Sequence, residues 1–204
     1  MLSRALELWL SLTEQINGVA TLLGATGYTG EYGYELFFPA THAVAMWNAI
    51  LEAGKPEGIL PCGLAARDSL RFEPCLPLYG HEIHARIDPI SARLSWAVSF
   101  KKGDFIGRDA LLKIKMEGPA QRLVGFEMAE RGVPRAEFPV AINGQVVGIV
   151  TTGMKSPTTD RFVGLAYVPA ASAALGSPID IVIRDAPKKA TVVKTPFYVA
   201  AYRR

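Results

Sequence analysis

The stretch from residue 24 to residue 39 constrains the fold most, because a glycine-rich turn in it runs directly into an alternating pattern. Glycine recurs at every third position, at Gly24, Gly27 and Gly30. Large side chains then alternate along the chain, at Tyr32, Tyr34, Leu36 and Phe38, and Pro39 follows. A period near two, with aromatic residues and a proline stop, is typical of a β-strand. The sequence therefore predicts a tight turn and then a strand over residues 34–38.

The glycine spacing also fits a second interpretation, a cradle for phosphate groups. An apolar run at residues 19–23 precedes the glycines, much as in the extended short-chain dehydrogenases. That fingerprint requires a helix next, whose N-terminal amides hold the pyrophosphate. A strand offers no such dipole, and the sequence contains no Tyr-x-x-x-Lys pair of the kind such a dehydrogenase would use. A nucleotide-binding oxidoreductase stays an alternative that requires a helix after Gly30.

Composition narrows the class of protein. The 204 residues are 50% hydrophobic and 20% charged, as in ordinary soluble globular proteins. A net charge of +3 is too small to indicate a nucleic-acid partner, for which a concentrated basic stripe would be expected. Cys62 and Cys75 are a sparse pair, so no disulfide framework is expected. No apolar run reaches the roughly 18 residues of a membrane span, and we expect a cytoplasmic protein without a membrane partner.

The first hundred residues are predicted to mix helices and strands. An apolar stripe predicts an amphipathic helix over residues 2–16, ended by Asn17-Gly18. The further expected elements are a strand at 19–23, helices at 42–53 and 64–72, a strand at 94–100 that contains Trp96, and a helix at 110–115 capped by Asp109. The helix at 42–53 is expected to face inward with Val44, Trp47, Ile50 and Leu51.

After residue 120 the pattern changes to short strands separated by turns. These strands are expected at residues 122–128, 139–142, 145–152, 162–167, 178–183 and 191–194. Asn143-Gly144 between two of them is a strong hairpin signal, because both positions tolerate a positive φ. Several short strands at this spacing favour a closed or sandwich-like β domain. We place the domain boundary within residues 101–119, where Gly118-Pro119 interrupts the chain.

Several separated motifs carry a family resemblance. The order Gly-Tyr-Thr-Gly-Glu-x-Gly-x-Glu at residues 27–35 is followed by Pro-Cys-Gly-Leu-Ala-Ala-Arg-Asp-Ser-Leu-Arg at residues 61–71. The later blocks are Leu-Tyr-Gly-His at 78–81, Leu-Ser-Trp-Ala-Val at 94–98, Lys-Gly-Asp-Phe-Ile-Gly at 102–107, Ser-Pro-Thr at 156–158 and Pro-Phe-Tyr at 196–198. Together they resemble the T-protein of the glycine cleavage system, the tetrahydrofolate-dependent aminomethyltransferase, in its C-terminal portion.

The resemblance implies an α+β fold with two parts. A partial folate-binding α/β domain of the T-protein type would occupy residues 1–100, and residues 101–119 would form a linker with a short helix. A C-terminal β-barrel domain would occupy residues 120–204. Family members carry another large segment upstream, with the aspartate that is assigned the central role near the reacting folate nitrogen. This chain begins after that segment, so we expect a fragment and assign no catalytic residue in it.

The resemblance also implies the reaction and its partners. The complete enzyme would take the aminomethyl group from the lipoyl arm of a carrier protein, transfer it to tetrahydrofolate and release ammonia. Tetrahydrofolate would be a co-substrate. Two chains could associate over the face that the upstream segment would cover. A non-catalytic folate-binding module and a related folate-dependent demethylase stay open as alternatives.

Five residues are candidates for the folate site by this resemblance. Glu35, the second glutamate of the first motif, would accept two parallel hydrogen bonds from the pterin edge. Arg67 would contact the pterin or orient a neighbouring carboxylate through its donor fork. Tyr28, Tyr79 and Trp96 would supply aromatic faces for the pterin or aminobenzoyl ring. We expect Glu35 to point from its strand into an aromatic slot that also admits Arg67, because an unpaired buried carboxylate is costly.

Each candidate has a plain structural alternative. Glu35 could form a salt bridge with an arginine, and Arg67 could pair with Asp68 or Glu73. The three aromatic side chains could simply pack in a core. His81-Glu82-Ile83-His84 brings two histidines and a carboxylate together, but the flanking glycine and Ile-Asp-Pro disfavour a helix and no third ligand group is near, so no metal is expected.

Three positions depart from the family pattern. Ala25 stands where the family usually has arginine. Ser91 and Arg93 stand where glutamate and glycine are common. These changes lie at the rim of the expected pocket.

Overall fold

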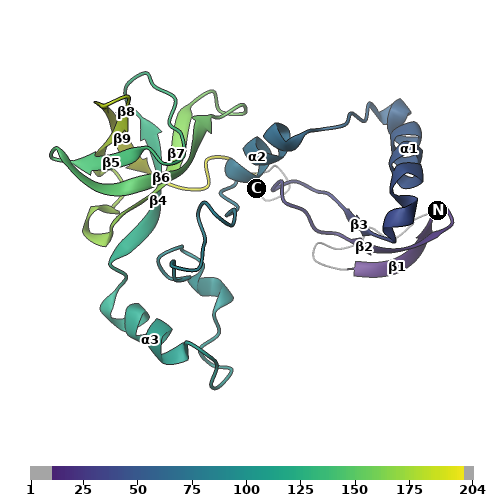
Figure 1. The fold of residues 1–204 in the computed structure, drawn as a ribbon, viewed down its shortest axis with the longest axis horizontal. Helices are drawn as coiled ribbons and strands as arrows, with labels where there is room; N and C mark the ends of the chain where they lie inside the picture. The colour runs from purple at the N-terminus through teal and green to yellow at the C-terminus, as the bar shows by residue number, and fades with distance from the viewer. Residues whose placement is uncertain (1–10, 200–204) are drawn as a thin grey trace. The chain divides into compact units, whose positions relative to one another are not determined.

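The computed structural model describes residues 11–199, which divide into two compact units. The N-terminal unit comprises residues 11–71 together with Val199, and the barrel unit comprises residues 72–198. Figure 1 shows a three-stranded sheet with helix α1 in the first unit and a barrel in the second. Each unit therefore has a β-sheet of its own.

The N-terminal unit is built on an antiparallel sheet of three strands, β1 (Ser11–Ile16), β2 (Val19–Gly24) and β3 (Glu35–Phe37), in that order. Asn17 and Gly18, with φ of 51° and 73°, form the turn between β1 and β2. The helix expected over residues 2–16 is therefore wrong from residue 11 onward, and its earlier part lies outside the described residues. The strands expected at 19–23 and 34–38 are confirmed by β2 and β3.

The error at β1 has a physical reason. Leu12 and Ile16 are four residues apart, and this spacing puts two side chains on one face of either a helix or a strand. The Asn-Gly turn pairs Ile16 with Val19, and the ladder continues as far as Ser11 opposite Gly24. A two-residue turn with positive φ at both positions matches the twist of paired strands. The hairpin therefore decides between two structures that the apolar spacing alone allows.

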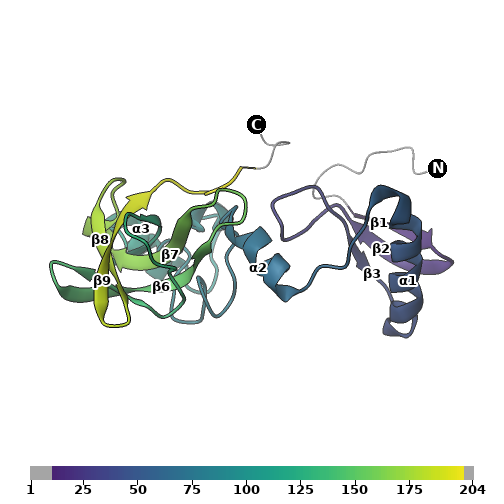
Figure 2. The same cartoon turned by 90° about the horizontal axis from the view of Figure 1, so that it is seen from above.

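Helix α1 packs on its unit through an unexpected side. The helical elements here are 3₁₀ helices at Ala40–His42 and Lys55–Glu57, α1 (Ala43–Gly54), and α2 (Leu64–Phe72), which confirms the helix expected at residues 64–72. Figures 1 and 2 both show α1 beside the three strands. Met46 is buried and Leu51 half-buried, whereas Val44, Trp47 and Ile50 are exposed. The prediction that Val44, Trp47 and Ile50 face inward is therefore wrong. The rest of the described unit covers the side of α1 that carries Met46.

Between α2 and the barrel the chain is mostly irregular. The strand expected at residues 94–100 is wrong, and a 3₁₀ helix occupies Ser95–Ala97 instead. The backbone N–H groups of Leu94 and Val98 donate to nearby carbonyls, those of Pro89 and Ser95. Local turns thus give hydrogen-bond partners to backbone N–H groups that, in a strand, would bond to a neighbouring strand.

Helix α3 (Arg108–Glu117) confirms the helix expected at residues 110–115. Its cap differs from the expectation. Gly107, at a φ of 87°, occupies the N-cap position, and Asp109 lies in the first turn. Glycine adopts this φ at little cost, and a carboxylate in the first turn still interacts favourably with the helix dipole.

The barrel unit closes six antiparallel strands in the order β4-β7-β6-β5-β8-β9, as far as the chain is described. These are β4 (Gln121–Met128), β5 (Pro139–Ile142), β6 (Gln145–Lys155), β7 (Phe162–Pro169), β8 (Pro178–Ile183) and β9 (Ala186–Val193), with a 3₁₀ helix at Ala170–Ser172. Asn143 and Gly144, with φ of 51° and 78°, turn the chain between β5 and β6 as expected. β9 begins at Ala186 rather than residue 191, because Arg184 and Asp185 form a tight turn at positive φ.

Every strand of the barrel contributes to its buried core. The core residues are Val124, Phe126, Met128, Val140, Val150, Ala166, Val168, Ile179, Ile181, Ala190 and Val192. Phe126 is fully buried and lies opposite Gly164 across β4 and β7. A Cβ added at Gly164 would come within 2.3 Å of the Phe126 ring. The ring therefore occupies the space that a side chain at position 164 would need.

The buried carboxylate of Glu82 attaches the irregular segment to the barrel. Its Oε1 accepts hydrogen bonds from the hydroxyls of Thr151 and Thr152, at 2.7 and 2.6 Å. Its Oε2 accepts one from the backbone N–H of Leu78 at 3.0 Å. The backbone carbonyl of Glu82 accepts a further one from the hydroxyl of Tyr167 at 2.7 Å. One residue thus joins the segment to both β6 and β7.

Glu73 makes a second attachment of the same kind. Its carboxylate accepts hydrogen bonds from the hydroxyl of Ser156 and from the backbone N–H and hydroxyl of Thr158, the last two at 2.9 and 2.6 Å. Its backbone carbonyl accepts the N–H of Phe197, whose ring lies 5.2 Å from that of Phe72. The start of the irregular segment is therefore held by the loop after β6 and by the chain beyond β9.

Asp88 shapes the loop before the barrel through its carboxylate. Its Oδ1 accepts the backbone N–H groups of Ile90 and Ser91, both at 2.9 Å, and its Oδ2 accepts the Ser91 hydroxyl at 2.6 Å. Burial acts to raise the pKa of Asp88, but the hydrogen bonds from Ser91 and Ile90 together outweigh it. The pKa therefore lies below its usual value, because these donors favour the charged form.

Replacing Asp88 with asparagine is expected to remove a pH-dependent part of the stability. A carboxyl group whose pKa is lowered by folding stabilises the fold above its unfolded pKa, and this contribution is lost as the pH falls through the folded pKa. Between about pH 6 and pH 2, the wild type should lose more of its free energy of unfolding than the variant does. Urea denaturation at a series of pH values measures the difference, and parallel curves for the two proteins would contradict the expectation.

Candidate functional site

The glycine turn leads directly to the carboxylate of Glu35. The β2–β3 register sets Gly24 opposite Glu35, and the hydroxyl of Thr26 donates a hydrogen bond to Glu35 Oε2. A Cβ added at Gly24 would lie 3.1 Å from the Thr26 hydroxyl oxygen, so glycine gives that side chain room. The hydroxyl holds one carboxylate oxygen, and a carboxylate has further lone pairs for other donors.

Glu35 is exposed, which differs from the expected buried position. β3 is a three-residue strand at the edge of the described sheet. Glu35 and Phe37 share one face of it, and both are exposed, whereas Leu36 on the other face is half-buried. The expectation of a carboxylate enclosed among aromatic side chains is therefore wrong for the described residues.

The strand at β3 also contradicts the phosphate-cradle interpretation. That interpretation needs a helix directly after Gly30, whereas residues 31–34 are bends and irregular backbone and residues 35–37 form a strand. No helix N-terminus follows these glycines, so the amides that a pyrophosphate would need are not arranged there.

Arg67 lies over an aromatic ring of the same unit. Its guanidinium carbon is 4.7 Å from the centroid of the Tyr28 ring, within the range of a cation–π contact. The ion-pair alternatives for Arg67 are wrong, because the carboxylate of Asp68 pairs with Arg71 at 2.7 Å and that of Glu73 binds Ser156 and Thr158. Arg67 is exposed, so its donor fork can meet an incoming ligand.

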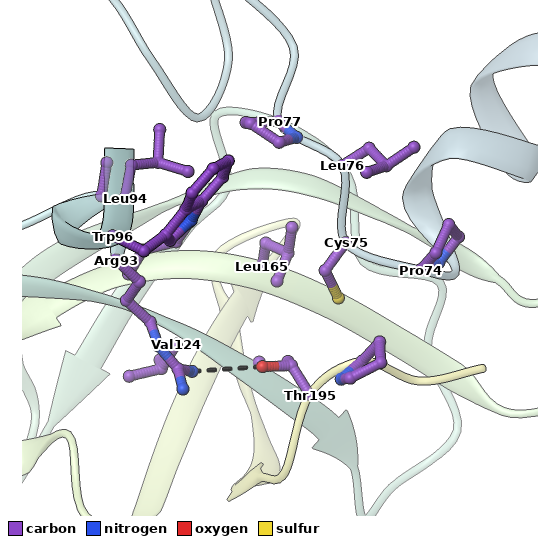
Figure 3. A pocket seen from close by; sticks show the side chains of 14 residues that line it. Pro74, Cys75, Leu76, Pro77, Arg93, Leu94, Trp96, Val124, Leu165 and Thr195 are labelled. Carbon is purple, nitrogen blue, oxygen red and sulfur yellow. Dashed lines mark hydrogen bonds between the residues drawn. The ribbon is translucent and has the colours of Figure 1, made fainter. Parts of the chain in front are cut away.

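Tyr79 and Trp96 belong to the barrel unit, so the five candidates fall into two groups. Tyr79 is 72% exposed and lines a pocket of about 600 Å³ with His81, His84 and Arg86. Trp96 is 82% exposed and lines a separate pocket of about 360 Å³, drawn in Figure 3. The alternative that Tyr79 and Trp96 simply pack in a core is therefore wrong. Tyr28, by contrast, is half-buried under Arg67.

The cluster at His81 and His84 has structural partners. Nδ1 of His81 lies 3.0 Å from the backbone carbonyl of Thr151, which can only accept, so this nitrogen donates. Nδ1 of His84 accepts the backbone N–H of Arg86 at 3.2 Å. Glu82 between them binds two threonine hydroxyls. Within residues 11–199, no group of three or more histidine, cysteine, aspartate or glutamate side chains is arranged to hold a metal ion.

Sequence reasoning missed two residues at these sites. Thr26, which orients Glu35, lies nine positions before it, and no local pattern links the two. Arg93 enters only as a departure from the family pattern, yet it lines the pocket beside Trp96 and binds Thr195 at 3.1 Å. The contact between Arg93 and Thr195 spans 102 positions, which a single sequence does not reveal.

Comparison with known proteins decides the family. The sequence matches the description "GCVT N-terminal domain" over residues 4–102 and "Glycine cleavage T-protein C-terminal barrel domain" over residues 121–198. The chain belongs to the glycine cleavage T-protein family. The closed barrel of β4 to β9 is the C-terminal barrel of that family, so the expected α+β fold with a terminal barrel is confirmed.

Curated T-protein relatives are named aminomethyltransferases, which are transferases. The one from Symbiobacterium thermophilum is 56% identical over 191 residues, which are 93% of this chain and 51% of that relative. The one from Geobacillus sp. (strain WCH70) is 50% identical over 187 residues, 91% of this chain and 51% of that relative. The chain thus spans about half the length of the curated relatives it matches.

A solved T-protein structure agrees with the fold. The glycine cleavage system aminomethyltransferase T from Bartonella henselae has a TM-score of 0.81 at 34% identity, and the match covers 87% of this chain and 50% of that one. The helices in the described part of the chain are too short or too polar to cross a membrane.

Proposed function

We propose that this chain serves an aminomethyltransferase of the glycine cleavage system and binds tetrahydrofolate. In the reaction, the carbon of the aminomethyl group on the lipoyl arm forms two bonds to folate nitrogens. Its bonds to sulfur and to the amino nitrogen break, the two folate protons go to these leaving groups, and a thiol and ammonia are released. The lipoyl-bearing carrier protein is the proposed donor partner.

The observation that carries this proposal is the exposed carboxylate of Glu35, held by Thr26, in a chain of the T-protein family. A carboxylate can accept two parallel hydrogen bonds from the N–H groups of a pterin edge. With Thr26 on one oxygen, the carboxylate keeps a defined orientation while its remaining lone pairs face solvent. Arg67 and Tyr28 offer a cation and a flat ring in the same unit as Glu35. Tyr79 and Trp96, both exposed in the barrel unit, are separate candidates for aromatic contact with folate.

The proposed contribution of these residues is to bind and orient folate. Holding two reactants in a productive geometry can supply a large part of a rate enhancement, and no proton transfer by a residue of this chain is needed for that role. We further propose that the 204 residues alone bind folate with little or no turnover. The support is that the chain spans about half the length of its curated relatives.

We also propose that the functional division of the chain lies within residues 101–119. The first family description ends at residue 102 and the second begins at residue 121, and α3 lies between them. By contacts, residues 72–119 group with the barrel. The proposed boundary thus lies between the two family domains. The boundary between the compact units falls earlier, because Glu73 and Glu82 bind residues 72–119 to the barrel.

Replacing Glu35 with glutamine is expected to weaken tetrahydrofolate binding about tenfold or more, because charge-assisted hydrogen bonds to the pterin are lost. Isothermal titration calorimetry of the full chain with tetrahydrofolate measures the affinity. Glu14→Gln is the matched control, since Glu14 is an exposed glutamate of β1 in the same sheet. Equal affinities for the two variants, or an absence of binding by the wild type, would contradict the folate proposal.

A turnover assay tests whether these 204 residues catalyse the reaction without the further part that their longer relatives have. The purified chain is mixed with tetrahydrofolate and aminomethylated carrier protein, and ammonia release is followed. We expect tight folate binding with negligible ammonia release. Turnover at the level of a full-length relative, measured in parallel, would refute the claim that this chain needs a further segment.

A further inference from the structure

The pocket lined by Arg86 and Glu137 lies wholly within the barrel unit, and it shares no lining residue with the pocket beside Trp96. It encloses about 600 Å³, a volume in the range of small-ligand sites. Arg86 and Glu137 are both exposed and carry opposite charges. Neither has an ion-pair partner among the described residues, so the two charges do not pair with each other. Two opposite charges are therefore available to a ligand in this pocket.

Arg86 and His84 together form a donor end of the pocket. The backbone N–H of Arg86 donates to Nδ1 of His84 at 3.2 Å, which keeps the two residues together. Because this Nδ1 accepts, the proton of the neutral ring is on Nε2, which can only donate. The N–H groups of a guanidinium can likewise only donate. A carboxylate suits such a set of donors, because a guanidinium binds it through two parallel hydrogen bonds.

His81 and Glu137 together form an acceptor end. Nδ1 of His81 donates to the carbonyl of Thr151 at 3.0 Å, so Nε2 of the neutral ring keeps its lone pair. The backbone N–H of Glu137 donates to the carbonyl of Val150 at 2.8 Å. Both residues are thus attached to consecutive positions of β6, where the pairing with β7 is irregular. An ammonium group suits this end, since it donates hydrogen bonds to a carboxylate and to an imidazole lone pair.

The turn that carries the two histidines is held in place without a ligand. The N–H of Gly80, which has a φ of 89°, donates to the carbonyl of Ile83 at 2.8 Å. The carboxylate of Glu82, between the histidines, accepts the hydroxyls of Thr151 and Thr152. A ligand therefore does not have to order this turn, which lowers the entropic cost of binding.

The pocket also offers apolar surface to a ligand. Ala85, Ala136 and Ile149 line it together with the polar groups. Ile149 is 46% exposed, although it belongs to a barrel strand. An aliphatic side chain of a ligand would remove part of this surface from water, which is favourable.

We propose that this pocket binds an apolar α-amino acid as its zwitterion. The carboxylate of the amino acid lies on Arg86 and His84, and its ammonium group lies on Glu137 and His81. Each end of the ligand thus has one charged partner and one neutral partner. The inference assigns no role to Tyr79 and does not depend on pterin recognition by Glu35.

Calorimetric titration of the full chain with L-leucine at pH 8, where an imidazole is ordinarily neutral, tests the proposal. Two analogues each keep one charge: 3-methylbutylamine lacks the carboxylate, and 4-methylpentanoate lacks the ammonium group. Leucine should bind at least about fivefold more tightly than either analogue, because it alone engages both exposed charges. Saturating tetrahydrofolate should leave the affinity for leucine unchanged.

Variants at the two charged residues should divide the ligand into its ends. Arg86→Gln should lower the affinity for leucine about fivefold and leave that for 3-methylbutylamine unchanged. Glu137→Gln should lower the affinity for leucine by a similar factor and leave that for 4-methylpentanoate unchanged. Arg135→Gln is the matched control, since Arg135 is an exposed arginine near Glu137 that does not line the pocket.

Any one of four results would overturn the proposal. These are no binding of leucine by the wild type, equal binding of leucine and either analogue, an unchanged leucine affinity in Arg86→Gln or Glu137→Gln, and displacement of leucine by tetrahydrofolate. The last result would assign the pocket to folate. None of the three probes contains a pterin, so the folate proposal at Glu35 is decided by its own titration.

Discussion

Replacing Phe126 with alanine is expected to lower the free energy of unfolding of the barrel unit by about 3–5 kcal/mol. The Phe126 ring is fully buried, belongs to the core that all six strands share, and fills the space above Gly164. Alanine would leave a cavity in a closed barrel, where the strands are paired on both sides and can collapse little. Urea denaturation, with hydrogen exchange of the β4 and β7 amides, measures the barrel unit separately from the N-terminal unit.

Gly164 provides the second half of this test. Gly164→Ala should destabilise the barrel by about 1–3 kcal/mol, because the added Cβ meets the Phe126 ring. Combining Gly164→Ala with Phe126→Leu should cost less than the two single changes together, since the smaller side chain makes room for the methyl group. Val146→Ala is a control on an exposed position of β6 and should change little. Strict additivity at 126 and 164 would contradict the contact between them.

Replacing Glu82 with alanine is the second large perturbation, with an expected loss of about 3 kcal/mol. Three hydrogen-bond donors converge on this buried carboxylate: the hydroxyls of Thr151 and Thr152 and the N–H of Leu78. Removing the carboxylate leaves these buried donors without their acceptor, which costs free energy because water does not replace it there. Because Glu82 joins the irregular segment to β6 through its side chain, hydrogen exchange should rise first in residues 78–83.

Glutamine at position 82 should be much milder, at about 1 kcal/mol. Its amide oxygen can accept the Leu78 N–H, and its NH₂ group can donate to the hydroxyl oxygens of Thr151 and Thr152. The Thr151 hydroxyl also has the carbonyl of Leu165 at 3.2 Å as another acceptor. Glu117→Ala, at an exposed glutamate of α3, is the control and should be nearly neutral. If alanine and glutamine at position 82 cost the same, hydrogen bonding is not the reason for the buried carboxylate.

The barrel strands were predictable because their signals are local. Alternating side chains and an Asn-Gly turn between β5 and β6 report on neighbours within a few residues. The same reasoning fails at residues 94–100, since a strand there needs a partner strand that the fold does not supply. At β1 the turn signal was present in Asn17 and Gly18, but the apolar spacing allowed a helix to be inferred before it.

The site was less predictable, because its contacts link distant positions. Family motifs single out Glu35 and Arg67 as candidates, and the structure adds their contacts: Thr26 on the carboxylate and Tyr28 under the guanidinium. The exposure of Glu35 could not be inferred, since an alternating pattern does not tell whether another layer covers a strand. Arg93 depends on a turn conformation and on Thr195, and neither follows from local sequence.

The two β-sheets differ in how they end. A closed barrel has no unpaired strand, whereas β1 and β3 are the outer strands of the described three-stranded sheet. Outer strands can recruit a foreign strand, and charged side chains on them discourage such aggregation. Glu14 and Glu35 are charges of this kind, so neutral variants at either position should be compared at equal and low protein concentration.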